Sequence, residues 1–131
     1  MRTLLVTLAV AAALTTTLPA AAADAGASTL ASVAPGVVDG ATARRLVAAG
    51  ARLVDVRTQQ EFDAGHVAGA VLIPYDQIAA RASELGAKDA PIVLYCRTGR
   101  RTAIAAQALQ ALGFTRVWDM QGMGNWPDAG R

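Results

Sequence analysis

The chain has 131 residues, a length typical of one domain. Hydrophobic residues make up 53% of it and charged residues 17%, which excludes a disordered or highly charged tail. The 12 Lys and Arg nearly balance the 10 Asp and Glu, and aromatic residues are only 5%, so we expect no nucleic-acid binding. One Cys and one His exclude an internal disulfide and the usual zinc sites, and we expect neither metal nor cofactor.

The N-terminal segment has the pattern of a secretory signal peptide. Arg2 precedes an apolar run over residues 4–14, and the alanines at 21–23 fit a cleavage site. An uncleaved membrane anchor is the alternative, but threonines at 15–17 interrupt a run that falls short of the about 20 apolar residues of a spanning helix. We therefore predict that residues 1–23 are removed on export. The protein would then be periplasmic or secreted, with no stable membrane insertion after cleavage.

Beyond a flexible lead-in predicted over residues 24–36, apolar strand patterns alternate with helical ones. The predicted elements are a helix over 41–49, a strand over 53–56, a short helix from 58, a strand over 71–73, a helical segment over 77–85, a strand over 92–95, a helix over 102–112, a strand over 116–118 and a short terminal helix within 122–129. Thr58 and Glu61 form a capping-box pattern, and Gly113 ends the longest helix. This alternation predicts an open α/β fold with a mainly parallel sheet.

Cys96 lies between a buried strand and the start of a helix, where open α/β sheets bind their ligands. The helix start offers free N–H groups and a partial positive charge, and Gly99 permits a tight turn that makes an anion-binding nest. Thr102 can cap the helix through its hydroxyl. Three cationic side chains lie in the same segment, at Arg97, Arg100 and Arg101. These features favour a nucleophilic thiolate and an anionic substrate, whereas a buried core Cys beside a solvated basic turn is the alternative.

Two segments resemble signatures of the rhodanese family. The first consists of Asp55-Val56-Arg57, Glu61-Phe62, the run GHVAGA over 65–70 and Ile73-Pro74. The second, CRTGRRT over 96–102, is similar to the active-site loop Cys-x-x-Gly-x-Arg-Ser/Thr. The C-terminal stretch is similar at Gly113-Phe114, Val117 and Trp126. With its signal peptide, the chain most resembles small periplasmic single-domain rhodaneses. The resemblance implies one domain over 37–131, whose mainly parallel five-stranded sheet has helices on both faces.

The resemblance implies sulfur transfer through a persulfide. Cys96 would attack the outer sulfur of thiosulfate, release sulfite and pass the bound sulfur to cyanide or to a thiol, which includes the thiol of a protein partner. The implied substrate-binding residues are Arg97, Thr98, Gly99, Arg100, Arg101 and Thr102. Arg101 matches the family's loop arginine and either meets the substrate or braces the loop. Mainly structural roles are implied for Asp55, Arg57, Glu61 and His66.

Three of these residues invite local predictions. Arg57 and Glu61 are one helical turn apart, which predicts an ion pair between them. His66 is expected to be a hydrogen-bonded structural residue rather than a catalytic base, because a preformed thiolate needs no base.

The C-terminal loop departs from the family pattern. The usual Gly-Gly before the final Trp is replaced by single glycines, and the loop over 122–126 is shorter. The large apolar residues around it, Met120, Met123 and Trp126, are expected to pack in the core. An apolar rim for a protein acceptor is the alternative.

Two other functions share parts of the pattern. A Cys-dependent phosphatase or arsenate reductase uses Cys-x5-Arg, which would need Arg where this chain has Thr102. A persulfide carrier that relays sulfur to a protein partner would need the same Cys96 and is the second alternative. A dinucleotide-binding enzyme is disfavoured, because no Gly-x-Gly-x-x-Gly follows a strand.

Overall fold

The computed structural model describes residues 20–128, which contain a five-stranded sheet in the order β1-β5-β4-β2-β3. Each neighbouring pair of strands is parallel. The strands are β1 (Gly36–Val37), β2 (Arg52–Asp55), β3 (Val71–Leu72), β4 (Ile92–Cys96) and β5 (Val117–Gly122). The predicted α/β fold with a parallel five-stranded sheet is therefore confirmed. Pattern analysis missed β1, because two residues are too few to show an alternation.

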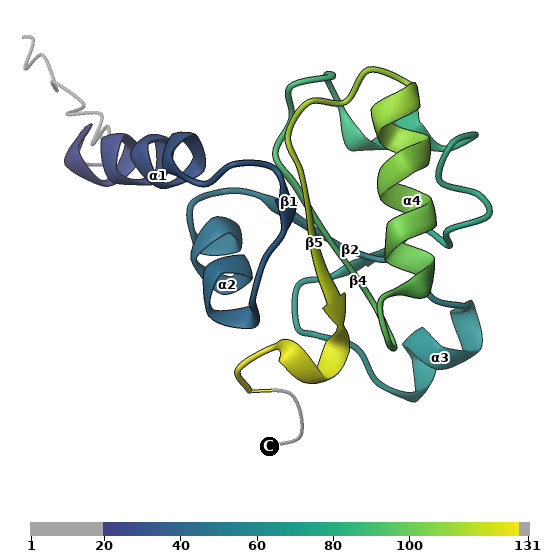
Figure 1. Ribbon diagram of the computed structural model, residues 1–131. Helices are drawn as coiled ribbons and strands as arrows, with labels where there is room; N and C mark the ends of the chain where they lie inside the picture. The colour runs from purple at the N-terminus through teal and green to yellow at the C-terminus, as the bar shows by residue number, and fades with distance from the viewer. Residues whose placement is uncertain (1–19, 129–131) are drawn as a thin grey trace, which may run out of the picture.

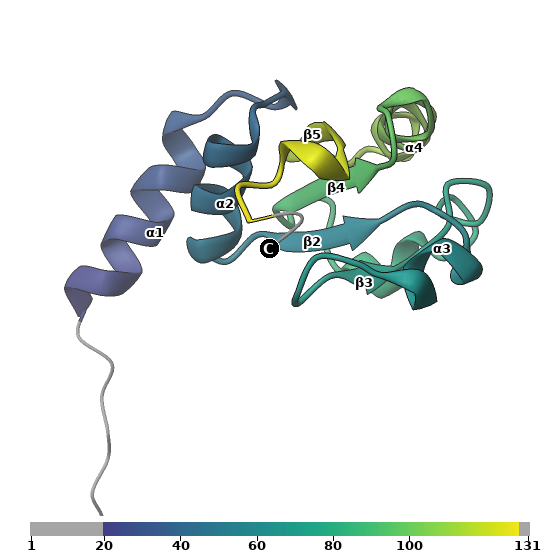
Figure 2. The ribbon, with the colours of Figure 1, turned by 90° about the horizontal axis from the view of Figure 1, so that it is seen from below.

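Helices cover both faces of the sheet, with α2 and α4 on opposite sides of the strands (Figure 1). The α-helices are α1 (Ala20–Ser32), α2 (Gly40–Ala48), α3 (Gln59–Ala64) and α4 (Arg100–Ala111), and two short 3-10 helices are η1 (Ala82–Leu85) and η2 (Met123–Asn125). Seen from below, α1 and α2 lie together at one end of the molecule and α3 lies at the other, near β3 (Figure 2). Both faces of the sheet are therefore buried, as a parallel sheet requires.

The central strand β4 contributes to both hydrophobic cores. Ile92, Leu94 and Cys96 belong to the α4-side cluster, which also contains Leu109 of α4. The alternate residues Val93 and Tyr95 belong to the α2-side cluster. Because successive side chains of a strand point to opposite faces, the Cys96 side chain lies on the side of α4.

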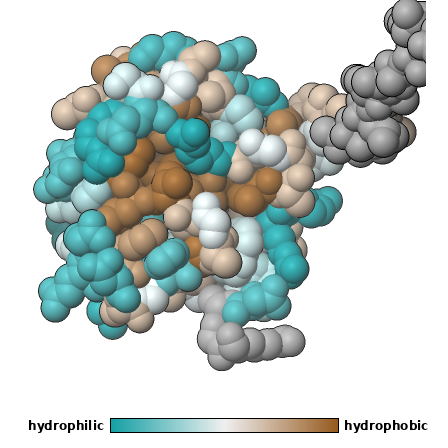
Figure 3. Space-filling view, turned by 180° about the vertical axis from the view of Figure 1, so that it is seen from behind, coloured by the Kyte–Doolittle hydropathy of each residue, from teal (hydrophilic) through white to brown (hydrophobic). Residues whose placement is uncertain are grey.

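On the face opposite to that of Figure 1, hydrophobic residues reach the surface at the centre and hydrophilic ones surround them (Figure 3).

The helix α4 begins two residues earlier than the sequence pattern predicts. Its N-cap is Gly99, with φ 108°, and the Thr102 hydroxyl donates to the Gly99 carbonyl at 2.8 Å. The prediction that Thr102 caps the helix is therefore wrong, since its hydroxyl binds a carbonyl oxygen and leaves the first N–H groups free. The C-terminal end is as predicted, because Gly113 is left-handed and its N–H donates to the Gln110 carbonyl.

The helical segment predicted over 77–85 is instead a series of turns followed by η1. Ile78, Ala82 and Leu85 are buried, and this spacing imitates the apolar face of an α-helix. The strand β5 is longer than the predicted strand over 116–118. The prediction stopped early because the polar residues Asp119 and Gln121 interrupt the apolar pattern of the strand. Spacing alone thus identified the buried residues but not the backbone conformation.

The helix α1 occupies most of the predicted flexible lead-in. Its many alanines favour a helix, and its Leu30 packs against the α2-side cluster. The Trp118 indole N–H on β5 also donates to the Val33 and Ala34 carbonyls, at 3.2 and 3.0 Å. Of the predicted signal peptide, residues 1–19 lie outside the described residues and 20–23 form the start of α1. No helix among residues 20–128 is long and apolar enough to cross a membrane.

Candidate active site

Cys96 is the last residue of β4 and is fully buried beside the start of α4. The Gly99 N–H donates to the Cys96 sulfur with an N–S distance of 2.9 Å. The Thr102 hydroxyl oxygen lies 4.0 Å from the same sulfur. The residues 97–99, here named the Cys96 loop, therefore fold back over the sulfur and present backbone N–H groups to it.

These N–H groups control the acidity of the thiol. Burial raises the pKa of Cys96, but backbone hydrogen bonds from Thr102, Gly99, Thr98 and Arg101 outweigh burial, and the pKa lies below its ordinary value. The thiolate fraction near neutral pH is correspondingly larger than for a free thiol. These hydrogen bonds therefore favour the nucleophilic form of Cys96.

Arg101 is paired with a carboxylate. Its two terminal nitrogens contact the two oxygens of Glu61, at 2.6 and 2.9 Å. Glu61 also accepts the Thr58 N–H at 3.0 Å, which completes the predicted capping box of α3. The ion pair therefore ties the first turn of α4 to α3, and of the two roles considered for Arg101, this geometry favours bracing.

The predicted ion pair between Arg57 and Glu61 is wrong. Arg57 instead binds Asp55, with a shortest N–O distance of 2.7 Å, and donates to the Gly65 carbonyl at 2.7 Å. Arg57 precedes the N-cap Thr58 and so lies outside the helix, where one-turn spacing brings side chains together. Its guanidinium is buried against the carboxyl end of β2.

Tyr95 connects this buried pair to the strand that carries Cys96. Its hydroxyl donates to Asp55 at 2.8 Å and accepts the Val67 N–H at 3.1 Å. Burial raises the pKa of Tyr95, so its hydroxyl keeps the proton that it donates. Sequence reasoning missed this role, although a hydroxyl in a fully buried strand was a signal that it needed partners.

His66 is exposed and lies at the start of the loop between α3 and β3. Its ring stacks on Phe62, with centroids 3.6 Å apart, and its Nδ1 lies 2.9 Å from the Phe62 carbonyl oxygen. The ring is hydrogen-bonded, as predicted, and its geometry fits a structural role rather than that of a base.

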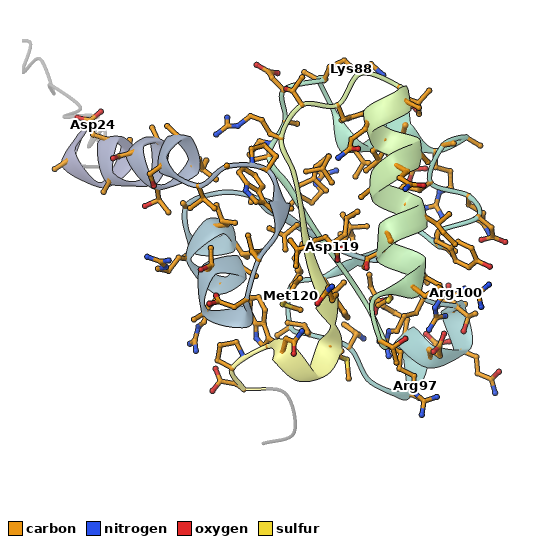
Figure 4. The ribbon with its side chains drawn as sticks, in the orientation of Figure 1. Asp24, Lys88, Arg97, Arg100, Asp119 and Met120 are labelled. Atoms are coloured by element: carbon orange, nitrogen blue, oxygen red, sulfur yellow. The ribbon has the colours of Figure 1, made fainter. Side chains whose placement is uncertain are left out.

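Two cations of the segment remain available to an anionic ligand. Arg97 and Arg100 are exposed at the same end of the molecule, near the start of α4, and project outward (Figure 4). Within residues 20–128, neither forms an ion pair. Arg97 lines a hollow of about 370 Å³ whose other lining residues are Arg57, Glu61, Ala64, Gly65, Met123 and Gly124. Thr98 is exposed in the same loop.

The C-terminal loop packs closely against the Cys96 loop. A Cβ atom on Gly122 would lie 2.8 Å from the Arg97 carbonyl oxygen, so this position needs a glycine. Met120 is fully buried, and Met123 and Trp126 pack against the α2-side cluster, as predicted. Met123 also reaches the hollow beside Arg97, which gives that hollow an apolar wall.

Comparisons with known proteins agree with this geometry. The family model described as "Rhodanese-like domain" matches residues 40–127. The Bacillus subtilis protein YqhL is 40% identical over 72 residues, which are 55% of this chain and 56% of that protein, so the chain spans about half of this relative's length. Chloroplastic thiosulfate sulfurtransferase 16 of Arabidopsis thaliana is 35% identical over 100 residues, covering 67% of this chain and 82% of that protein. The structure of the human single-domain sulfurtransferase TSTD1 matches with a TM-score of 0.64 and 28% identity, covering 76% of this chain and all of that one.

Proposed function

The chain belongs to the family of rhodanese-like domains, and from this premise we propose that it is a thiosulfate sulfurtransferase that works through a persulfide on Cys96. The observation that carries the proposal is the contact between the Gly99 N–H and the Cys96 sulfur. The same N–H groups that favour the thiolate suit the negative terminal sulfur of a persulfide. The named activity of the Arabidopsis relative supports this choice of reaction.

In the first step, the Cys96 thiolate attacks the outer sulfur of thiosulfate. A sulfur–sulfur bond forms to Cys96, the sulfur–sulfur bond of thiosulfate breaks, and sulfite leaves with the electron pair. In the second step, cyanide or a thiolate attacks the terminal sulfur of the persulfide. Thiocyanate or a new persulfide leaves, and the Cys96 thiolate is regenerated. Neither step needs a general base, because both nucleophiles are anions.

The charge around the loop suits a doubly negative donor. Arg97 and Arg100 form no described ion pair, whereas Arg101 is neutralised by Glu61. We assign the sulfonate end of thiosulfate to the hollow lined by Arg97. Thr98 and Gly99 contribute backbone N–H groups at the sulfur end, and Thr102 contributes the same through the first turn of α4.

The phosphatase alternative fits the geometry less well. A phosphate site of that type uses its loop arginine to bind the substrate, but both terminal nitrogens of Arg101 donate hydrogen bonds to Glu61. A persulfide carrier uses the same chemistry at Cys96 and differs only in its acceptor, for which the apolar wall at Met123 offers a contact.

We further propose that the protein acts after export, in the periplasm or outside the cell, because residues 1–23 have the pattern of a signal peptide.

A turnover assay tests the proposal. Purified protein is incubated with thiosulfate and cyanide, and thiocyanate and sulfite are measured, with Cys96→Ser as the control. We expect equal amounts of both products and none above background from the control. No hydrolysis of an aryl phosphate is expected. Slow turnover with cyanide but rapid transfer to a protein thiol would identify a carrier instead, and thiocyanate formation that survives Cys96→Ser would refute the proposal.

A further inference from the structure

The strand β5 contains an irregularity where it passes the Cys96 loop. Its pairing with β4 shifts by one residue between Leu94–Asp119 and Tyr95–Gln121, so Met120 is an extra residue on β5. Gln121, which follows, has φ 68°, and it is the one non-glycine residue of the described chain in the left-handed region. Bulges next to active sites often redirect the strand, and such strained residues persist only when their surroundings hold them.

The contact that holds Gln121 comes from Asp119. The Asp119 Oδ1 atom accepts the Gln121 N–H at 2.7 Å, and this hydrogen bond closes the bulge on itself. The Asp119 side chain is nearly fully buried and extends from β5 (Figure 4). An aspartate that binds the backbone N–H two residues later stabilises a turn, which here is built into a strand.

The bulge in turn lies beside the Cys96 loop. A Cβ atom on Gly99 would lie 3.1 Å from the Gln121 Cβ, and one on Gly122 would lie 2.8 Å from the Arg97 carbonyl oxygen. The bulge and the loop therefore lie too close together for a side chain on Gly99 or Gly122. Gly99 is also the residue whose N–H reaches the Cys96 sulfur, so the bulge borders the donor of that hydrogen bond.

We propose that Asp119 is a positioning residue for Cys96: by holding Gln121 in its left-handed conformation, it keeps the β5 bulge beside Gly99 and thereby keeps the Gly99 N–H directed at the sulfur. Asp119 acts through the backbone and does not touch substrate. The inference deepens the proposed function and takes from it only that Cys96 reacts as a thiolate. On this view two braces hold the loop and the first turn of α4, Glu61 from α3 and Asp119 from β5.

The proposal predicts that the acidity of Cys96 depends on Asp119 as a hydrogen-bond acceptor and not as a charge. The charged groups around Cys96 are Arg97, Arg100 and Arg101 on the loop and α4, Glu61 on α3, Asp55 and Arg57 at the end of β2, and Asp119 on β5. Asp119→Ala and Asp119→Asn remove the same negative charge, which by itself lowers the pKa of Cys96 equally in both. Only Asp119→Asn retains an oxygen that can accept the Gln121 N–H.

The test follows the alkylation of Cys96 by iodoacetamide as a function of pH, which reports the thiolate without any sulfur donor. We expect the midpoint of Asp119→Ala to lie above that of Asp119→Asn by about one pH unit, which is about a tenfold smaller thiolate fraction below both midpoints. Asp119→Asn should keep the wild-type midpoint or fall slightly below it. Equal midpoints in the two variants would overturn the proposal, whether or not the protein transfers sulfur.

A double variant tests the step through Gln121. Asn tolerates the left-handed conformation better than Gln and keeps the Cβ that contacts Gly99. The double variant Asp119→Ala with Gln121→Asn should therefore regain most of the shift in midpoint, and a double variant that shifts as far as Asp119→Ala alone would contradict this step. If Asp119→Ala does not fold by circular dichroism, Asp119→Leu, which refills the space without an acceptor, takes its place in the comparison.

Discussion

Arg101 and Glu61 join α4 to α3 through two hydrogen bonds, of 2.6 and 2.9 Å, although they lie 40 residues apart in the chain. Both side chains are mostly shielded from solvent, with exposed fractions of 22% and 28%. The arginine that the loop motif offers to a substrate is thus engaged in fixing the loop that carries the N–H groups. Glu61 is engaged twice, because it also completes the capping box at Thr58.

Glu61→Gln should therefore weaken both the fold and the site. We expect a loss of about 1–2 kcal/mol in the free energy of unfolding, since a charge-assisted pair becomes a neutral contact. The rate of persulfide formation should fall as the loop loosens. The matched control is Glu84→Gln, which breaks the exposed ion pair with Arg81 and should change neither quantity appreciably. Urea unfolding measures the free energy of unfolding, and quenched reactions with thiosulfate measure the rate of persulfide formation. Equal effects of the two substitutions would contradict the bracing role.

The same ion pair makes stability depend on acid pH. The hydrogen bonds from Arg101, with smaller contributions from Thr58, lower the pKa of Glu61 from 4.5 to about 2. Because the folded-state pKa is depressed, the stabilisation is complete above pH 4.5 and is lost as the pH falls toward about 2. The difference in unfolding free energy between wild type and Glu61→Gln should accordingly shrink across this range. A difference that stays constant down to pH 2 would contradict the assignment.

Tyr95→Phe should destabilise the end of β4. It leaves the Val67 N–H without its acceptor and removes one donor from Asp55, both in a buried region. The expected cost is about 1–3 kcal/mol in the free energy of unfolding, measured in urea. Tyr75→Phe is the control, because the Tyr75 hydroxyl has no hydrogen-bond partner within residues 20–128. A loss no larger than that of Tyr75→Phe would show that the hydroxyl contributes little.

Arg97→Ala should impair the binding of the donor rather than the reactivity of the thiol. Loss of a charge-assisted contact to the sulfonate should raise KM for thiosulfate about tenfold, with a smaller change in kcat. The pH midpoint of Cys96 alkylation should change little. Arg45→Ala on α2 removes the same charge at a distant helix and serves as the control. An unchanged KM in Arg97→Ala would place the sulfonate elsewhere, with Arg100 as the next residue to replace.

Local sequence patterns predicted the parts of the site that depend on neighbouring residues. The capping box at Thr58 and the glycine that ends α4 are short-range devices, and both are present. The pairs Arg101–Glu61 and Tyr95–Asp55 are each separated by 40 residues and depend on how the strands are ordered. Spacing therefore suggested the wrong partner for Glu61. For Tyr95 the signal was a hydroxyl within a buried strand, which shows that partners are needed but not which ones.

No sequence pattern predicts the left-handed backbone conformation of Gln121. A glycine in a sequence indicates a possible positive φ, whereas the positive φ of Gln121 accompanies a hydrogen bond from its N–H to Asp119 that forms within the β5 bulge. The segment before Pro35 also differs from its sequence-based prediction. Its small residues predict a flexible lead-in, but these alanines form a helix because α2 provides a surface on which they pack.

If Cys96 carries the transferred sulfur, as we propose, intact mass spectrometry will detect that sulfur on the protein. The protein is incubated with thiosulfate, freed of small molecules and weighed, then treated with cyanide and weighed again, beside Cys96→Ser. We expect a gain of one sulfur atom in the wild type alone, which cyanide removes. An unchanged wild-type mass, or the same adduct on Cys96→Ser, would contradict it.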